Sequence, residues 1–97
     1  MPTYVTLAKW TDQGMKGIKD VPKRLEAFEA AMKAAGGKVK DFYLVMGEYD
    51  FIVITEGPND ETAARLTLAT GMGGNVRTVT MKAFTRDETV KIIQGLP

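Results

Sequence analysis

The order of strand-like and helix-like segments constrains this chain more than any other feature of its sequence. Runs rich in β-branched and aromatic residues predict strands at Thr3–Trp10, Lys38–Met46, Asp50–Glu56 and Val76–Thr85. Apolar residues spaced three and four apart predict helices at about Val21–Ala35 and Asp60–Thr70. Strand, helix, strand, strand, helix, strand is the ferredoxin-like order of an α+β domain, in which two helices cover one face of a four-stranded antiparallel sheet.

Residues at the segment ends support this order. Thr11-Asp12-Gln13-Gly14 is predicted to be a turn, and Asp20 suits the start of the first helix. Gly36-Gly37 is predicted to end that helix. Thr85, with a glutamate three residues later, fits a capping box and predicts a short extra C-terminal helix to about Gln94.

The strands are apolar on both sides, which is unusual for a sheet with one solvated face. Alternation places Val5 and Leu7 on one side of the first strand and the aromatic Tyr4 and Trp10 on the other. Because two helices cover only one face, we expect the other to be buried against a second copy, in a homodimer or larger homo-oligomer. The alternative is a monomer whose C-terminal helix covers that face.

Composition excludes several classes of function. The chain has 97 residues, no cysteine, no histidine and a formal net charge of +1. It therefore lacks the common transition-metal ligands, and no carboxylate cluster suggests a hard cation, so neither a metal nor a cofactor is expected. Without a basic patch interleaved with aromatics, no nucleic-acid partner is expected. With no apolar run near ~18 residues, we expect no membrane association and a single cytoplasmic domain over residues 1–97.

The tetrapeptide Gly47-Glu48-Tyr49-Asp50, between the second and third strand segments, is the main candidate for function. It has a structural interpretation, since glycine permits a positive φ and aspartate bonds local backbone N–H groups. In the functional interpretation, Tyr49 donates a hydrogen bond to a substrate oxygen and Asp50 acts as a base if burial raises its pKa. Trp10 and Tyr43 are aromatic candidates for the wall of a small-molecule pocket beside them.

Several motifs in order resemble the GYD domain family. They are Thr11-Asp12-Gln13-Gly14, Pro22-Lys23-Arg24, Gly47-Glu48-Tyr49-Asp50, and Gly74-Asn75-Val76-Arg77-Thr78 through Ala83-Phe84. The resemblance runs from Tyr4 to about Gln94 and implies a ferredoxin-like domain of the dimeric α/β-barrel type, without implying one activity. A looser similarity, in the turn and the fold, links the chain to the effector-binding domain of Lrp/AsnC regulators, whose DNA-binding helices are absent here.

Three functions remain open from the sequence. The first is an oligomeric binding or sensor module for a small molecule, and the second is a cofactor-free oxygenase, isomerase or decarboxylase. The third is a structural or interaction subunit. A cleft lined by Trp10, Tyr43, Tyr49 and Asp50 would favour the first two, and the pKa of Asp50 would separate them. The lack of histidine counts against an enzyme.

Overall fold

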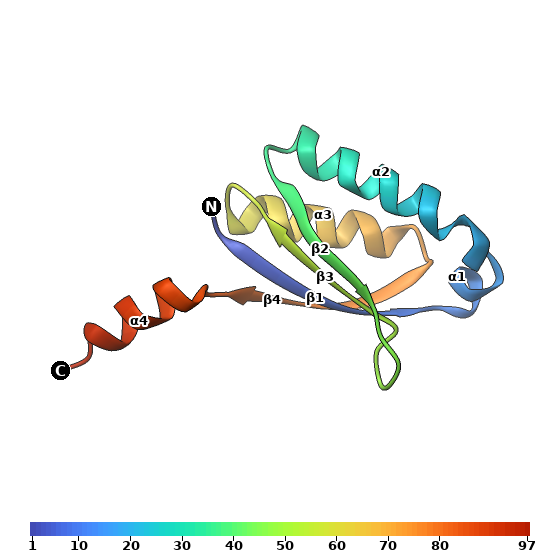
Figure 1. Ribbon diagram of the computed structural model, residues 1–97. Helices are drawn as coiled ribbons and strands as arrows, with labels where there is room; N and C mark the ends of the chain where they lie inside the picture. The colour runs from blue at the N-terminus through green and yellow to red at the C-terminus, as the bar shows by residue number, and fades with distance from the viewer.

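The computed structural model describes residues 1–97 as a sheet with one helical layer (Figure 1). Its strands are β1 (Thr3–Trp10), β2 (Lys38–Leu44), β3 (Phe51–Glu56) and β4 (Val76–Ala83). They are arranged in the order β2-β3-β1-β4, and every neighbouring pair is antiparallel. The helices α2 (Val21–Ala34) and α3 (Asp60–Met72) lie on the same face of the sheet. The ferredoxin-like fold predicted from the order of elements is therefore confirmed.

Three shorter elements complete the chain: α1 (Asp12–Lys16), the 3₁₀ turn η1 (Ile18–Asp20) and α4 (Arg86–Gln94). The turn predicted at 11–14 is instead the start of α1, capped by the Thr11 hydroxyl, which accepts from the Gly14 N–H at 3.1 Å. Asp20 makes no side-chain cap, because η1 leads directly into α2, so its predicted capping role is wrong. The capping box of Thr85 and Glu88 is confirmed.

Two predicted strands end early. β2 stops at Leu44 and β4 at Ala83, and β3 begins at Phe51. Residues 45–50 form the hairpin loop instead, closed by the Val45 N–H, which donates to the Asp50 carbonyl at 2.9 Å. The apolar side chain of Met46 thus lies in the loop and is 99 % exposed. Apolar residues therefore continue in the sequence beyond Leu44, although the chain there no longer pairs with a neighbouring strand.

The space between the helices and the sheet is only partly filled. Met32 of α2, Tyr4 and Ala8 of β1, and Val53 of β3 form the buried apolar core, but no large side chain is fully inaccessible. The contacts of α2 with the sheet are mainly to β2, and those of α3 are to β4. The two helices therefore stand apart over the central strands β1 and β3 (Figure 1).

The opposite face of the sheet has no covering element. Tyr43, Val79 and Met81 on this face are each about half exposed. Helix α4 continues away from the end of β4 rather than folding back, so within one chain it does not cover the face (Figure 1). The alternative of a monomer closed by its own C-terminal helix is therefore wrong for this structure. None of the helices has the length and hydropathy that a membrane crossing requires.

Candidate functional site

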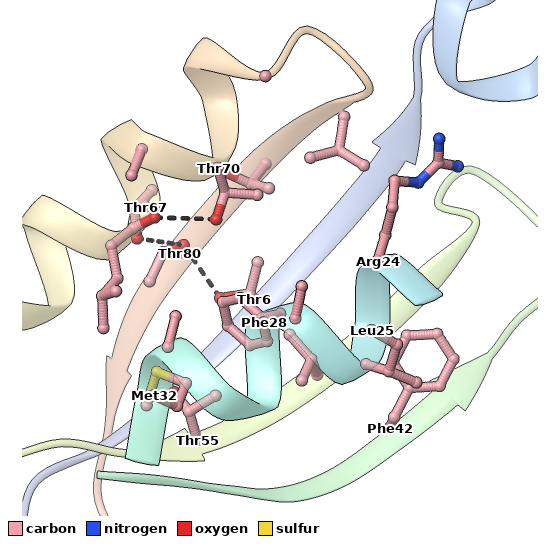
Figure 2. A pocket seen from close by; sticks show the side chains of 18 of the residues that line it. Thr6, Arg24, Leu25, Phe28, Met32, Phe42, Thr55, Thr67, Thr70 and Thr80 are labelled. Carbon is pink, nitrogen blue, oxygen red and sulfur yellow. Dashed lines mark hydrogen bonds between the residues drawn. The ribbon is translucent and has the colours of Figure 1, made fainter. Parts of the chain in front are cut away.

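A cavity of about 390 Å³ lies between the two long helices and the sheet. Its floor is formed by alternate residues of the central strands, including Thr6 and Trp10 of β1 and Phe51 and Val53 of β3. Helices α2 and α3 form its walls (Figure 2). Cavities of about 300–1,000 Å³ with mainly apolar walls are typical of small-molecule sites.

The two sides of the cavity differ in chemistry. The side formed by α2 and β2 is apolar except for Arg24 at one end, with Leu25, Phe28, Met32 and Phe42 (Figure 2). Hydroxyl groups line the opposite side, contributed by α3, β4 and β1: Thr62, Thr67, Thr70, Thr78, Thr80 and Thr6. A molecule held here would therefore meet hydrocarbon on one side and hydrogen-bonding groups on the other.

The hydroxyls are held by hydrogen bonds to the fold. Thr67 and Thr70 each donate to a carbonyl one turn earlier in α3, those of Ala63 and Leu66, at 2.9 Å. The Thr6 and Thr80 hydroxyls lie 3.0 Å apart across the β1–β4 pair. Because a hydroxyl that donates its proton still has lone pairs, these groups can accept hydrogen bonds from a bound molecule.

At the end of the cavity near the start of α3, Tyr4 and Asp60 connect the helix to the sheet. The Tyr4 hydroxyl donates to Asp60 Oδ1 at 2.5 Å. Asn59 caps the same helix end by accepting from the Thr62 N–H at 2.8 Å. Burial of the ring, together with the hydrogen bond and the charge of Asp60, raises the pKa of Tyr4 to about 12. Tyr4 is therefore a neutral donor at physiological pH.

This contact predicts a loss of stability in strongly alkaline solution. The folded-state pKa of Tyr4 is raised from 10.0 to about 12, so its stabilisation is complete below pH 10 and is lost as the pH rises through about 12. We expect Tyr4→Phe to lower the free energy of unfolding by about 1–3 kcal/mol near neutral pH and to flatten its fall between pH 10 and 12. Urea denaturation across this range measures both effects.

The matched control is Tyr43→Phe, because Tyr43 is 54 % exposed on the open face. It removes one tyrosine hydroxyl without touching the Tyr4–Asp60 contact. If the free energy of unfolding falls equally in the two variants between pH 10 and 12, Tyr4 does not cause the alkaline loss of stability.

The structure separates the four residues predicted to line one cleft. Trp10 lines the cavity, and its ring centroid is 5.1 Å from that of Phe51. Tyr43 lies on the opposite face of the sheet, and Tyr49 is in the β2–β3 loop, where the Lys9 ammonium is 5.4 Å from its ring centroid. Neither tyrosine is among the cavity-lining residues.

Asp50 connects the hairpin loop to β1. Its carboxylate accepts from the Trp10 N–H at 2.9 Å, and its own N–H donates to the Ala8 carbonyl at 2.8 Å. Gly47 has a φ of 150°, a region that favours glycine. These contacts agree with the structural interpretation of the Gly47–Asp50 turn; a role of Tyr49 or Asp50 in ligand binding stays a prediction.

The GYD domain family model matches residues 4–93 of the chain. The chain belongs to this family. A curated relative from Thermus thermophilus, described as a glutamine synthetase and cystathionine beta-lyase binding protein, is 33 % identical over 85 residues. The alignment covers 87 % of this GYD protein and 90 % of the relative.

Solved structures share the fold of this GYD domain. FFRP-DM1 has a TM-score of 0.62 at 23 % identity, with 87 % of this chain and all of that chain covered. A feast or famine regulatory protein from M. tuberculosis (Rv3291c), solved with L-methionine, has a TM-score of 0.66 at 20 % identity over 88 % of this chain and 51 % of its own. TTHA0845 from Thermus thermophilus has a TM-score of 0.53 at 22 % identity over 88 % and 95 % of the two chains.

Residues of this GYD domain that sequence reasoning missed are the cavity threonines and Arg24. A signal was present, because Thr67 and Thr70 lie on the apolar stripe of α3, and Thr78 and Thr80 alternate along β4 toward the helices. Hydroxyls at positions that face the core indicate a lining that is not purely hydrophobic. The chain has no cluster of three or more side chains suited to hold a metal ion.

Proposed function

We propose that this GYD domain is an oligomeric binding module that holds a small, mainly apolar molecule between α2, α3 and the sheet. The observation that carries this proposal is the cavity of about 390 Å³ at the position where a domain of this fold would place its core. An empty cavity costs stability, because the atoms around it lack contact partners. A bound molecule would supply those partners, so binding and folding stability are expected to be coupled.

The lining favours binding over catalysis. Among the residues around the cavity there is no aspartate, glutamate, lysine or histidine, so no side chain there is suited to act as a general base near neutral pH. The M. tuberculosis protein solved with L-methionine supports small-molecule binding as a property that this fold permits. A cofactor-free enzyme is therefore less well supported than a binding module.

Filling the cavity tests the proposal. Ala63 on α3 lines the cavity, whereas Ala64 beside it is exposed and does not. With octan-1-ol as the probe, we expect thermal stabilisation of the wild type and of Ala64→Leu. In Ala63→Leu the added side chain occupies the binding volume, so the affinity should fall by at least about tenfold. Differential scanning fluorimetry and calorimetric titration measure these effects.

The two alanine variants make the same chemical change on the same helix, so altered helix propensity affects both equally. Absence of stabilisation of the wild type, or equal binding by Ala63→Leu and Ala64→Leu, would contradict the cavity as the binding site.

We also propose that two copies pair through the open face of the sheet. The strand register places Leu7 beside Ile52 and Val79, and Val5 beside Ile54 and Met81. These six side chains form a continuous apolar surface, here called the open-face cluster, which water would otherwise cover. An isologous pair would bury it, and the mass in solution would be at least twice the 10.6 kDa of one chain.

A second candidate function is the binding of another protein. It is supported by the Thermus thermophilus relative, which is described as binding two enzymes, and by the exposed apolar residues Val90, Ile92 and Ile93 of α4. Ala63→Leu separates the two candidates. In this variant the affinity for a partner protein should be unchanged, whereas the affinity for a small molecule should fall.

A further inference from the structure

Arg24 is the only residue with a permanent charge among those lining the cavity. It extends from α2 toward the end of the cavity opposite to Met32 and Thr55 (Figure 2). Asn75 also lines that end, since the Gly14 that Arg24 contacts packs on it, and Trp10 is next to Asn75 because it pairs with Val76. The cavity therefore has one cationic end, and the rest of its lining is uncharged at neutral pH.

The guanidinium of Arg24 forms no ion pair; the carboxylate of Asp20 lies on the same side, across Gly17, without reaching it. Its one hydrogen bond is a long one, from Nη2 to the Gly14 carbonyl at 3.4 Å. The two ion pairs of the chain are elsewhere, between Lys40 and Glu56 and between Arg65 and Glu61. Arg24 is partly exposed, and its guanidinium nitrogens without a hydrogen bond keep contact with solvent, so they are available as donors to an incoming carboxylate.

The Arg24 guanidinium contacts the backbone of α1, which is held to the α3–β4 loop by several hydrogen bonds. The Thr11 N–H donates to the Asn75 carbonyl at 3.0 Å. Gln13 Nε2 donates to the Gly73 carbonyl and to Asn75 Oδ1, both at 3.0 Å. Gly14, which accepts from Arg24, packs directly on Asn75. The guanidinium thus lies against a rigid support, and the Asn75 amide NH₂ remains as a second donor at this end.

We propose that the molecule held in the cavity is a carboxylic acid with an apolar body, whose carboxylate binds Arg24. This rests on the proposed function and names its ligand class. The planar guanidinium matches a carboxylate with two parallel charge-assisted hydrogen bonds, and the apolar body would lie against Phe28 and Phe42. No aspartate or glutamate lines the cavity, so the ammonium of an amino acid would have no anionic partner within it. A simple acid is therefore preferred over an amino acid.

Trp10 is the sole tryptophan of the chain, so its fluorescence reports binding at the Arg24 end. Three probes share one hydrocarbon chain and differ in the polar group: octanoate, 2-aminooctanoate and octan-1-ol. We expect octanoate to bind wild type about tenfold to a hundredfold more tightly than either of the others.

Arg24→Gln should remove this preference, because it should lower the affinity for octanoate far more than the affinity for octan-1-ol; octan-1-ol binding that persists also shows that the variant is folded. Arg24→Lys should keep a weaker preference, because it retains the charge without the planar fork. If octanoate and octan-1-ol bind equally, or if Arg24→Gln leaves octanoate affinity unchanged, the carboxylate inference is overturned while the binding function stands. If none of the probes changes Trp10 emission or thermal stability, both are overturned.

Discussion

Replacing Val79 with lysine is expected to dissociate the protein into monomers. Val79 lies within the open-face cluster, next to Leu7 on β1, and is 47 % exposed in the single chain. A lysine there can extend into water in the monomer, so the fold itself should tolerate it. In a two-fold pair the change occurs twice, and each ammonium would be buried against apolar side chains. We expect the dissociation constant to rise by at least about 100-fold.

Leu68→Lys is the matched control, because Leu68 is 70 % exposed on α3 and lies outside both the cavity and the open face. Sedimentation velocity or light scattering after gel filtration measures the mass of each variant. Wild type and Leu68→Lys should remain oligomeric. A monomeric wild type, or a Val79→Lys protein that stays oligomeric, would show that copies do not pair through this face.

The fold could be predicted from the sequence because periodicity determines which side each residue faces. The predicted alternation along the first strand places Tyr4, Thr6 and Trp10 on one side, and these are residues that β1 directs toward the helices. The capping box at Thr85 could likewise be predicted, since it involves residues only three apart. Local rules of this kind require no knowledge of tertiary distances.

The cavity could not be predicted in the same way, because it depends on how far apart α2 and α3 stand. Small side chains such as Ala27, Ala31 and Ala63 line it from the two helices, and their size matters only when the opposite wall is known. Alanine in a helix is otherwise explained by propensity alone. Arg24 was missed for a related reason: an arginine in a helix usually extends into solvent, and only the tertiary structure places it at a cavity end.

The Gly47–Asp50 turn could also be interpreted only in part from the sequence. Its glycine and aspartate could be interpreted as turn residues from their own backbone preferences. The partner of the Asp50 carboxylate, however, is the backbone N–H of Trp10, forty residues earlier in the chain. That contact explains why a carboxylate follows Tyr49, whose own ring lies 5.4 Å from the Lys9 ammonium.

Gly14→Ala is expected to lower folding stability more than any of the other substitutions proposed above. Gly14 is buried in α1, and a Cβ at this position would overlap the Asn75 carbonyl oxygen and lie 2.9 Å from the carbonyl carbon. Both groups belong to backbone, so neither can move aside as a flexible side chain would. Relief requires α1 to separate from the α3–β4 loop, which would weaken the hydrogen bonds of Thr11 and Gln13 to that loop. We expect a loss of about 2–4 kcal/mol in the free energy of unfolding.

Gly71→Ala is the matched control, because a Cβ at that position of α3 would meet nothing within 4 Å. At Gly71 the gain in helix propensity is the only expected effect. We therefore expect the free energy of unfolding to stay the same or to rise by up to about 1 kcal/mol. Chemical denaturation of the two variants at one pH gives both values. A Gly14→Ala protein as stable as wild type would show that α1 does not pack against Asn75. Because Arg24 donates to the Gly14 carbonyl, that result would also remove the support proposed for the carboxylate-binding end of the cavity.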